Sequence, residues 1–361
     1  MRIFLCGDVM TGRGIDQILP HPCDPVLFEP YMTSAINYVR LAEAWTGDIP
    51  RRVPPDYIWG DAPGEIEAAA PNLRIINLET SITADGTPEP KGINYRMHPD
   101  NTPAIAAFKP DACVLANNHI ADWGPESLTD TLDALTAAGL AYVGAGRNAE
   151  EAARPLTVET QGARLHLFAV ACPSSGTPDH WAAGSDTPGV HVLADMSTTS
   201  FERLARNIAA YSAPEDVVVL SIHWGGNWGY EISERHREFA HGLIEHAGVD
   251  IIFGHSSHHP KAIEVHKGRP ILYGCGDFLN DYEGIRGHES YRPELVLGYL
   301  LDLDTNGALT RLEMLPFRLR KFRLNRISAE EAEWLRARLD RECRKFGRGV
   351  RLADGRLVLE I

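Results

Sequence analysis

The sequence lacks a long apolar run. The apolar part of the N-terminal stretch "MRIFLCGDVMTGRG" is only four or five residues long. No other run approaches the ~20 residues that a membrane-spanning helix requires. A secretory signal peptide also needs a longer apolar segment before its cleavage site. The sequence therefore predicts a cytoplasmic protein with no membrane partner.

Cysteine is scarce, with six in 361 residues, and no two form a C-x-x-C pair. Most of the cysteines lie inside apolar runs such as "IFLC" and "AVACP", a setting typical of buried, reduced thiols. This pattern argues against a disulfide framework and against a structural zinc site built from cysteines.

Positive charge is also in deficit. The chain has 35 Lys and Arg residues against 49 Asp and Glu residues, which gives a formal net charge of −14. A surface of that sign repels polyanions, so nucleic acid is excluded as a partner and anionic membranes are disfavoured. A positive pocket can still exist on such a protein where it holds metal ions.

What the chain does contain is a regular alternation of β-rich and helical segments. Short β-rich runs bounded by glycine or polar residues predict strands at residues 2–6, 73–78, 112–116, 141–145, 164–172, 217–224, 250–255, 261–266, 270–277 and 294–303. Helical periodicity and capping signals predict helices at 125–139, 197–212, 232–248 and 328–347. Alternation of this kind predicts an α/β fold with helices covering the faces of its sheets.

The chain divides into one large domain and a C-terminal region. Residues 17–71 are irregular and rich in proline, which predicts a long insertion after the first strand that contributes to a substrate pocket or lid. Residues 321–361 contain a charged helix, capped by Ser328 with Glu331 three residues later, and are predicted to form a helical appendage. The catalytic domain is therefore predicted at residues 1–320.

Polar residues of a metal-binding kind follow the predicted strands. They are Asp8, Glu79, Asn118, His119, Asp122, His223, His255, His258, His259 and Asp277. Ligands of α/β proteins bind outside the carboxyl ends of the strands. Carboxylate, amide and imidazole donors suit Mn²⁺, Fe²⁺ or Zn²⁺, with Mg²⁺ or Ca²⁺ as alternatives. Each residue alone also has a structural interpretation, such as turn capping by Asp8 or a hydrogen-bonded core position for His223.

The order of these motifs resembles the CapA-type family of poly-γ-glutamate capsule biosynthesis proteins, a branch of the metallo-dependent phosphatase superfamily. The resemblance rests on "GDVMTGR", "NLE", "NNHIADWG", "HWG", "GHSSHHP" and "GDF", and it covers residues 2–320. It implies a four-layer αββα sandwich with one or two divalent metal ions at one end.

The resemblance also implies a set of metal ligands. Asp8 and His258 match ligands of a first ion, and Glu79 takes the place of a bridging aspartate. The residues that match ligands of a second ion are Asn118, His223 and His255. One position departs from the pattern, because many members open with D-x-H and the residue two after Asp8 is Met10. A thioether cannot replace imidazole for a hard ion, so Met10 weakens the phosphatase interpretation.

Further residues are candidates for substrate binding. Arg13 and Arg96 suit a carboxylate or phosphate, because guanidinium binds such groups through two hydrogen bonds. His98 belongs to the same "NYRMHP" stretch as Arg96. Trp224 and Trp228 could line an apolar pocket beside the metals. The alternatives are surface ion pairs for the arginines and ordinary packing for the tryptophans.

The main functional hypothesis is epimerisation of a peptide or small carboxylate substrate. Soluble members of the family are similar to epimerases of ribosomal-peptide pathways, such as lasso-peptide epimerases, which invert a C-terminal residue. Chelation of a carboxylate acidifies the adjacent C–H, and a base on each face exchanges the proton. His119 with Asp122 would serve one face, and His258, His259, Asp8 or Asp277 the other. His259 could equally be an outer hydrogen-bonding partner or merely exposed.

Two alternatives stay open beside epimerisation. One is metal-dependent phosphoester hydrolysis, in which His119 matches the histidine that protonates the leaving oxygen and Asp122 orients it. The other is hydrolysis or ligation of a γ-glutamyl polymer. The oligomeric state is open as well.

Overall fold

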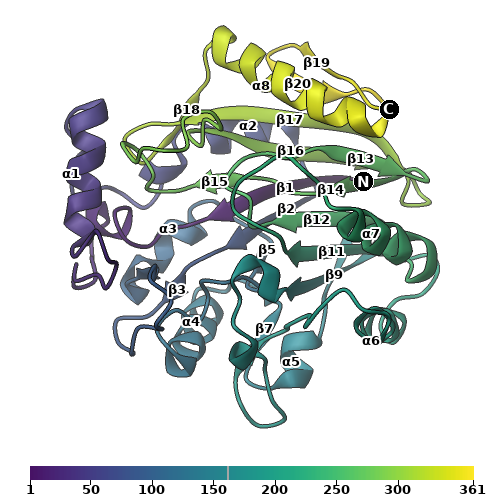
Figure 1. The fold of residues 1–361 in the computed structure, drawn as a ribbon, viewed down its shortest axis with the longest axis horizontal. Coiled ribbons are helices and arrows are strands. Elements are labelled where there is room, and N and C mark those ends of the chain that lie inside the picture. The colour runs from purple at the N-terminus through teal and green to yellow at the C-terminus, as the bar shows by residue number, and fades with distance from the viewer. Residues whose placement is uncertain (161) are drawn as a thin grey trace.

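Two stacked β-sheets form the centre of the protein in the computed structural model, which describes residues 1–160 and 162–361 (Figure 1). The larger sheet has ten strands in the order β19-β20-β17-β16-β1-β2-β5-β6, with β15 beside β1 and β18 beside β17. Its strands are β1 (Arg2–Val9), β2 (Leu73–Leu78), β5 (Ala112–Val114), β6 (Tyr142–Val143), β15 (Asp277–Leu279), β16 (Leu295–Leu303), β17 (Leu309–Leu319), β18 (Leu324–Arg326), β19 (Val350–Ala353) and β20 (Arg356–Leu359). Strands β1, β2, β5 and β6 run parallel, whereas β16 and β17 are antiparallel.

The smaller sheet has six strands in the order β13-β14-β12-β11-β9-β8. Its strands are β8 (Leu156–Thr160), β9 (Ala163–Ala171), β11 (Val217–His223), β12 (Ile251–His255), β13 (Ile263–His266) and β14 (Arg269–Leu272). Every residue of β11 is buried, as expected for a parallel strand covered on both faces. Two short pairs complete the strands, β3 (Ser81–Ile82) with β4 (Arg96–Met97) and β7 (Ala145–Gly146) with β10 (Gly189–Val190).

Helices cover the outer face of each sheet. They are α1 (Ala35–Thr46), α2 (Ala62–Ala69), α3 (Thr102–Ala106), α4 (Pro125–Ala137), α5 (Ala149–Ala153), α6 (Thr198–Ala209), α7 (Glu234–His246) and α8 (Ala329–Cys343), with 3-10 turns at Asp16–Ile18, Tyr57–Trp59, Pro99–Asn101, Pro173–Ser175, Asp179–Trp181 and Arg344–Phe346. In β11, Val219 joins the core between the sheets, whereas its neighbour Val218 packs with Leu243 of α7 on the outside. On the larger sheet, Phe108, which follows α3 in the chain, has its ring centroid 5.9 Å from that of Phe4 in β1. The predicted αββα sandwich is therefore confirmed.

The predicted strand at 270–277 is two strands in two different sheets, so that prediction is wrong. Strand β14 ends at Leu272 in the smaller sheet, and β15 begins at Asp277 beside β1 in the larger one. The chain crosses between the sheets through Gly276, whose φ is 75° and where a side chain would lie 2.9 Å from the Pro260 nitrogen. The crossing places Asp277 directly opposite Asp8.

Two regions lie outside the predicted alternation of strands and helices, and both contain regular secondary structure. The insertion at 17–71 holds α1 and α2. In the C-terminal region, the Ser328 hydroxyl accepts a hydrogen bond from the Glu331 backbone N–H. The Glu331 carboxylate in turn accepts a hydrogen bond from the Ser328 backbone N–H, so the predicted capping box of α8 is confirmed. The region at 321–361 is not purely helical, because β18 and β20 pair with β17 and extend the larger sheet.

Candidate metal centre

Four of the predicted ligands meet with Asp277 where strands of both sheets end, namely Asp8, Glu79, His223 and His258. The other two predicted ligands, Asn118 and His255, belong to neither ligand group among the described residues. Asp8 lies near the end of β1, and Glu79 follows the last residue of β2. His223 and His255 end the neighbouring strands β11 and β12 and stand opposite each other in register. Asp277 opens β15, in register with Asp8. Because the parallel strands of each sheet end at the same edge, side chains from distant parts of the chain gather there.

Two groups of potential metal ligands overlap at Asp8. One consists of Asp8, Glu79 and His223, and the other of Asp8, His258 and Asp277. In each group the ligand atoms lie within 4.8 Å of one another, and all five side chains are buried. The arrangement allows one carboxylate to contact two ions. Asp277, which the sequence predicts as a catalytic residue, thus lies at ligand distance from Asp8.

The metal cluster consists of Asp8, Glu79, Asn118, His223, His255, His258 and Asp277. Several of its buried atoms have no hydrogen-bond partner among the described residues. They are Asp8 Oδ2, Asn118 Oδ1, both ring nitrogens of His223, and His255 Nε2. A buried polar group left unsatisfied costs about 1–3 kcal/mol, so such a concentration requires an explanation. Carboxylate and amide oxygens and the unprotonated nitrogen of a neutral imidazole are the lone-pair donors that divalent ions bind. The residues present therefore fit a metal ion.

The protonation states also suit a metal ion. Burial lowers the pKa of His223 to about 3, so its imidazole is neutral and free to ligate. His255 Nδ1 lies 2.9 Å from Asp8 Oδ1, which places the proton on Nδ1 and leaves Nε2 as a lone pair. Burial opposes ionisation of Asp8, but hydrogen bonds from His255 and Asn77 hold its pKa below the ordinary value.

The other two carboxyl groups show how much negative charge is crowded here. Burial, followed by the charges of Asp8 and Asp277, raises the pKa of Glu79 well above its ordinary value. Burial also raises the pKa of Asp277, although His258 opposes this effect with a contact of 2.9 Å between Nδ1 and Oδ1. A divalent cation would neutralise this repulsion and let all three carboxyl groups ionise.

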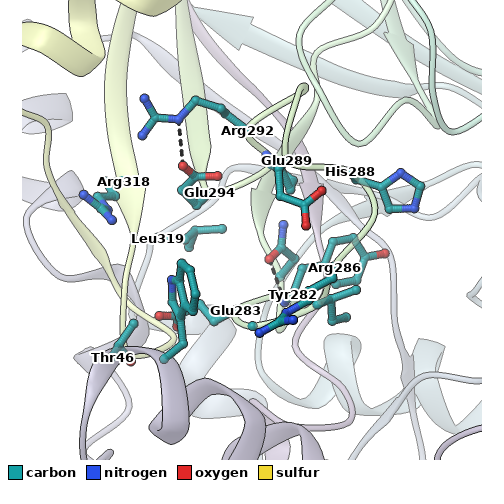
Figure 2. Close-up of a pocket in the computed structure, with 15 residues that line it drawn as sticks. Thr46, Tyr282, Glu283, Arg286, His288, Glu289, Arg292, Glu294, Arg318 and Leu319 are labelled. Atoms are coloured by element: carbon teal, nitrogen blue, oxygen red, sulfur yellow. Dashed lines mark hydrogen bonds and ion pairs between the residues drawn. The ribbon is translucent and has the colours of Figure 1, made fainter.

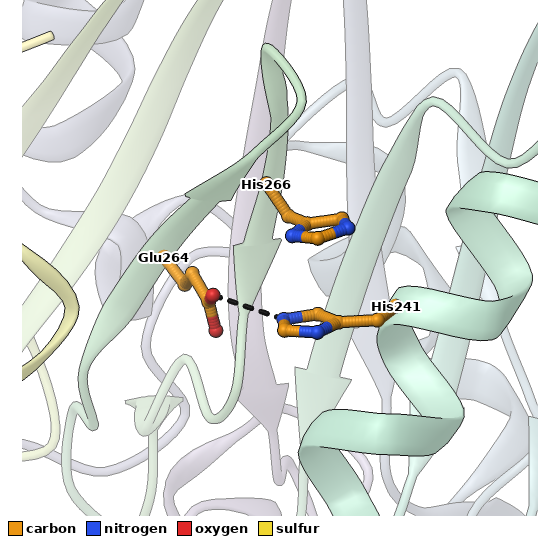
Figure 3. A group of neighbouring side chains, drawn as sticks. All are labelled: His241, Glu264 and His266. Atoms are coloured by element: carbon orange, nitrogen blue, oxygen red, sulfur yellow. Dashed lines mark hydrogen bonds and ion pairs between the residues drawn. The ribbon is translucent and has the colours of Figure 1, made fainter.

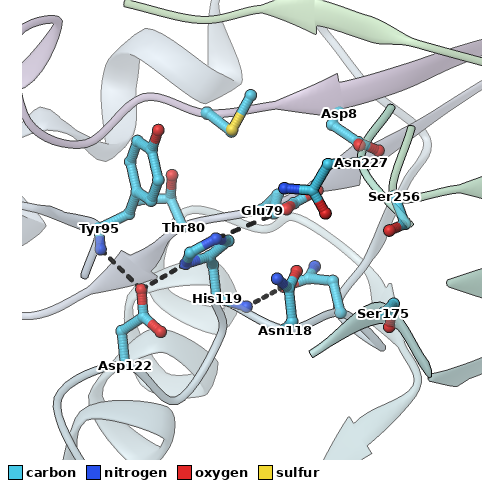
Figure 4. A network of polar contacts seen from close by, with 12 residues as sticks. Asp8, Glu79, Thr80, Tyr95, Asn118, His119, Asp122, Ser175, Asn227 and Ser256 are labelled. Carbon is cyan, nitrogen blue, oxygen red and sulfur yellow. Dashed lines mark hydrogen bonds and ion pairs between the residues drawn. The ribbon is translucent and has the colours of Figure 1, made fainter. Parts of the chain in front are cut away.

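His119 stands beside the cluster and is held by the carboxylate of Asp122 (Figure 4). Its Nδ1 lies 2.6 Å from Asp122 Oδ2, and its Nε2 lies 4.0 Å from Glu79 Oε1. Lys91 contacts Asp122 Oδ1 at 2.7 Å and also donates to the backbone oxygen of Asn118. Burial lowers the pKa of His119 to about 4, with Asp122 opposing the effect and Lys91 adding to it. Sequence reasoning missed Lys91, because "EPKG" carries no motif.

His259, a predicted base, is engaged elsewhere. Its Nε2 accepts from the Gly229 backbone N–H at 3.1 Å, and its Nδ1 lies 3.2 Å from the Pro260 carbonyl oxygen. The ring stacks on Tyr291 and Trp228. Both nitrogens are therefore used, and the ring fixes the loop that carries His258.

The two arginines predicted to bind substrate instead bind other residues of this protein. Arg13 is buried, bonds Asp281 and Glu29 with its guanidinium, and packs on aromatic rings. Arg96 lies over the Trp123 ring at 3.8 Å and donates to two backbone carbonyls. His98 accepts from the Asp100 backbone N–H through Nδ1. The described contacts of Arg96 and His98 include no member of the metal cluster.

The two tryptophans separate into different environments. Trp224 is buried in the outer core of the smaller sheet and donates to the Tyr273 carbonyl oxygen at 3.0 Å. Trp228 stacks on His288 at 3.8 Å and lines a cavity of about 130 Å³ together with His258 and Tyr282. Only Trp228 therefore borders space next to the cluster.

That cavity shares its wall with a larger one. The larger cavity measures about 600 Å³, and Tyr282, Ile285, His288 and Pro293 line both. Figure 2 shows Tyr282, Arg286 and His288 on one side of it and Arg318 on the other. Together the two cavities extend from His258 of the metal cluster, along the loop that joins β15 to β16, to Arg318 of β17.

Met10 occupies the position where the sequence pattern lacks a histidine. It is fully buried, and its sulfur lies 3.8 Å from the Tyr282 hydroxyl. The same hydroxyl lies 3.4 Å from His258 Nε2. Nothing in this arrangement makes Met10 a metal ligand, and Asp277 supplies the third side chain of that ligand group instead.

These features define a class: an αββα sandwich with a candidate metal centre of carboxylate, amide and imidazole donors at the carboxyl ends of its strands. Residues 2–282 match the family described as bacterial capsule synthesis protein PGA_cap, and the chain belongs to that family. The resemblance to the CapA-type family is thereby confirmed.

Two sequence relatives agree with this assignment. The chain is 49% identical to a "Probable polyglutamine synthesis accessory protein" of Mycobacterium tuberculosis, over 96% of this chain and 92% of that one. It is 31% identical to the PGA biosynthesis protein CapA of Bacillus subtilis, over 56% of this chain and 49% of that one. Among solved structures, a 5′-nucleotidase precursor from Thermus thermophilus aligns with a TM-score of 0.45 at 14% identity, over 88% of this chain and 54% of that one.

Within residues 1–160 and 162–361, no helix combines the length and the apolar character that crossing a bilayer demands.

Proposed function

We propose that this protein is a metal-dependent hydrolase that acts on a phosphoester. The observation that carries the proposal is the pair of ligand groups sharing Asp8, because two-metal hydrolysis needs neighbouring ions. Divalent ions held there supply Lewis-acid catalysis, since they polarise a phosphoryl oxygen and make water more acidic. The protein contributes buried, oriented ligands and a dry setting in which these electrostatic effects are strong.

The position of His119 supports the proposal. Its Nε2 faces Glu79 at 4.0 Å and is therefore next to the place that a substrate oxygen would occupy. Asp122 fixes the ring orientation through Nδ1 and opposes the effect of burial on the pKa of His119, so it favours the imidazolium form, in which Nε2 carries a proton for the leaving oxygen. Lys91 holds Asp122 in place through the other carboxylate oxygen, Oδ1, at 2.7 Å.

The cavities support a substrate with a sizeable leaving group. Trp228 and His258 line the smaller cavity beside the cluster, and the larger one continues beyond Tyr282. The part of the substrate that does not react has room there, between aromatic rings and charged side chains.

Epimerisation fits the site less well. It needs a base on each face of the substrate, but both nitrogens of His259 are hydrogen-bonded and Asp277 is held by His258 and Asn280. The aromatic pocket it requires is also reduced, because Trp224 lies in the outer core. Hydrolysis uses only His119 and the ligand cluster.

A second candidate substrate is an amide bond of a γ-glutamyl polymer. The 49% identity to a protein named as a probable polyglutamine synthesis accessory protein favours it. Metal-assisted hydrolysis of an amide would use the same cluster, with His119 placed to protonate the departing amine.

The experiment is an assay of p-nitrophenyl phosphate and bis(p-nitrophenyl) phosphate with protein loaded with Mn²⁺, Fe²⁺ or Zn²⁺. We expect release of p-nitrophenol, and we expect His119→Asn to lower kcat at least ~100-fold while metal content stays unchanged. His98→Asn is the matched control, because it also removes an imidazole but lies outside the cluster.

Parallel incubations separate the alternatives. Poly-γ-glutamate is followed by release of free amino groups, and a peptide in D₂O is followed by deuterium at Cα. Deuterium exchange without hydrolysis of either phosphoester, under all three metals, would overturn the proposal in favour of epimerisation.

A further inference from the structure

A second group of metal-ligand side chains lies between helix α7 and strand β13 (Figure 3). It consists of His241 from α7 and of Glu264 and His266 from β13, and their ligand atoms lie within 4.8 Å of one another. Glu245 of α7 joins it, because its Oε1 lies 2.6 Å from His266 Nε2. The group shares no residue with the candidate metal centre.

The spacing of these residues places all four side chains in one narrow gap. Residues i and i+4 of a helix lie on the same face, as His241 and Glu245 do. Residues i and i+2 of a strand point to the same side, as Glu264 and His266 do. Each imidazole Nε2 faces a carboxylate oxygen, His241 toward Glu264 at 2.9 Å and His266 toward Glu245 at 2.6 Å.

Neighbouring contacts fix the positions of these side chains, and the group is open to solvent. Tyr273 donates to Glu264 Oε2 at 2.7 Å, which fixes that carboxylate and leaves Oε1 directed at His241. The imidazole rings stack with their centroids 3.8 Å apart, and one nitrogen of each lies within 4.8 Å of the other and of a Glu264 carboxylate oxygen. The side chains of His241 and His266 are 24% and 19% exposed, which gives an ion access from solvent.

One cation competes for this group. Lys267 lies 3.0 Å from Glu245 Oε2, but its side chain is 61% exposed and can swing into water when an ion binds. With neutral imidazoles, the four candidate ligands carry two negative charges, so a divalent ion balances them.

We propose that His241, His266, Glu264 and Glu245 form a second, independent binding site for a divalent transition-metal ion of the Zn²⁺ type. Two imidazole nitrogens with two carboxylate oxygens match the donors and the four-coordination that Zn²⁺ prefers. Strand β13 is an edge strand of the smaller sheet, and α7 covers that sheet. The bound ion therefore joins the edge of the sheet to the helix that covers it.

The test measures Zn²⁺ content after dialysis against micromolar Zn²⁺, for the intact chain and for two variants. His266→Gln removes a ligand. His246→Gln is the control, because it removes an exposed histidine of the same helix that lies 4.0 Å from Glu245 but is not one of the four proposed ligands. We expect His266→Gln to bind one Zn²⁺ fewer per chain than the other two proteins. Equal content in all three would overturn the proposal.

Two further readouts separate this site from the candidate metal centre. Zn²⁺ should raise the Tm of the intact chain and of His246→Gln by several degrees more than that of His266→Gln. Any phosphoesterase activity of the manganese-loaded protein should be the same in His266→Gln. An equal Zn²⁺-dependent rise of Tm in all three proteins, or a loss of activity in His266→Gln, would contradict the assignment.

Discussion

Replacing His223 with leucine should reverse the order of stability depending on whether metal is present. His223 is fully buried, and both of its nitrogens lack a hydrogen-bond partner among the described residues. Leucine has a similar volume and no polar atom. Because an unsatisfied buried polar group costs about 1–3 kcal/mol, metal-free His223→Leu should be ~2 kcal/mol more stable than the metal-free natural chain.

Bound metal changes the comparison. A ligand present at ~100 times its Kd stabilises the folded state by about 2.7 kcal/mol, and the variant has lost a ligand, so it gains little of this. The natural chain should then be the more stable one. The measurement is urea unfolding followed by tryptophan fluorescence, with a chelator and then with Mn²⁺ or Zn²⁺ in excess.

His166→Leu is the control for this experiment. His166 is also buried, in the neighbouring strand β9, but its nitrogens contact Thr157 at 2.9 Å and Asp216 at 3.0 Å. Its replacement should cost roughly 2 kcal/mol both with and without metal, since it leaves partners unpaired. If His223→Leu is likewise destabilised in the chelator, the orphaned nitrogens do not mark a metal site.

Three other perturbations test separate parts of the structure. Burial raises the pKa of Asp250 to about 6, so the folded state binds a proton more tightly than the unfolded state and loses stability as pH rises from about 4 to about 6. In the natural chain this loss of unfolding free energy amounts to up to roughly 3 kcal/mol. It should disappear in Asp250→Asn, as measured by urea unfolding at about pH 4 and about pH 7. Lys91→Met removes a cation that lowers the pKa of His119, so the inflection that His119 contributes to the pH–rate profile of hydrolysis should move to higher pH; an unmoved profile would refute the coupling. Ser328→Ala removes half of the capping box of α8 and should cost about 1 kcal/mol in urea unfolding, whereas no loss would show that the cap is dispensable.

Much of the site is predictable because its residues end strands that have a clear apolar pattern. Asp8, His223 and His255 each complete a buried run, and parallel strands bring such residues to one edge. Asp277 was harder to place, because the break between β14 and β15 depends on a crossing between sheets that the local pattern does not contain.

Other features depend on contacts that no local pattern encodes. Strand β17 contains Pro316, which pairs opposite Leu297 of β16, and a proline inside a run argues against a sheet strand. The burial of Arg13 depends on Glu29 and on Asp281, which lies 268 residues away along the chain. Sequence spacing therefore suggested a substrate ligand where the fold has an internal ion pair.

The claim that Asp8 is shared between bound divalent ions is tested most directly by anomalous diffraction from crystals soaked in Mn²⁺, recorded on both sides of the manganese edge. We predict two anomalous peaks about 3.5–4 Å apart, both in contact with the Asp8 carboxylate, one also beside His223 and the other beside His258. Manganese-loaded crystals in which only one peak, or none, touches Asp8 would contradict the claim.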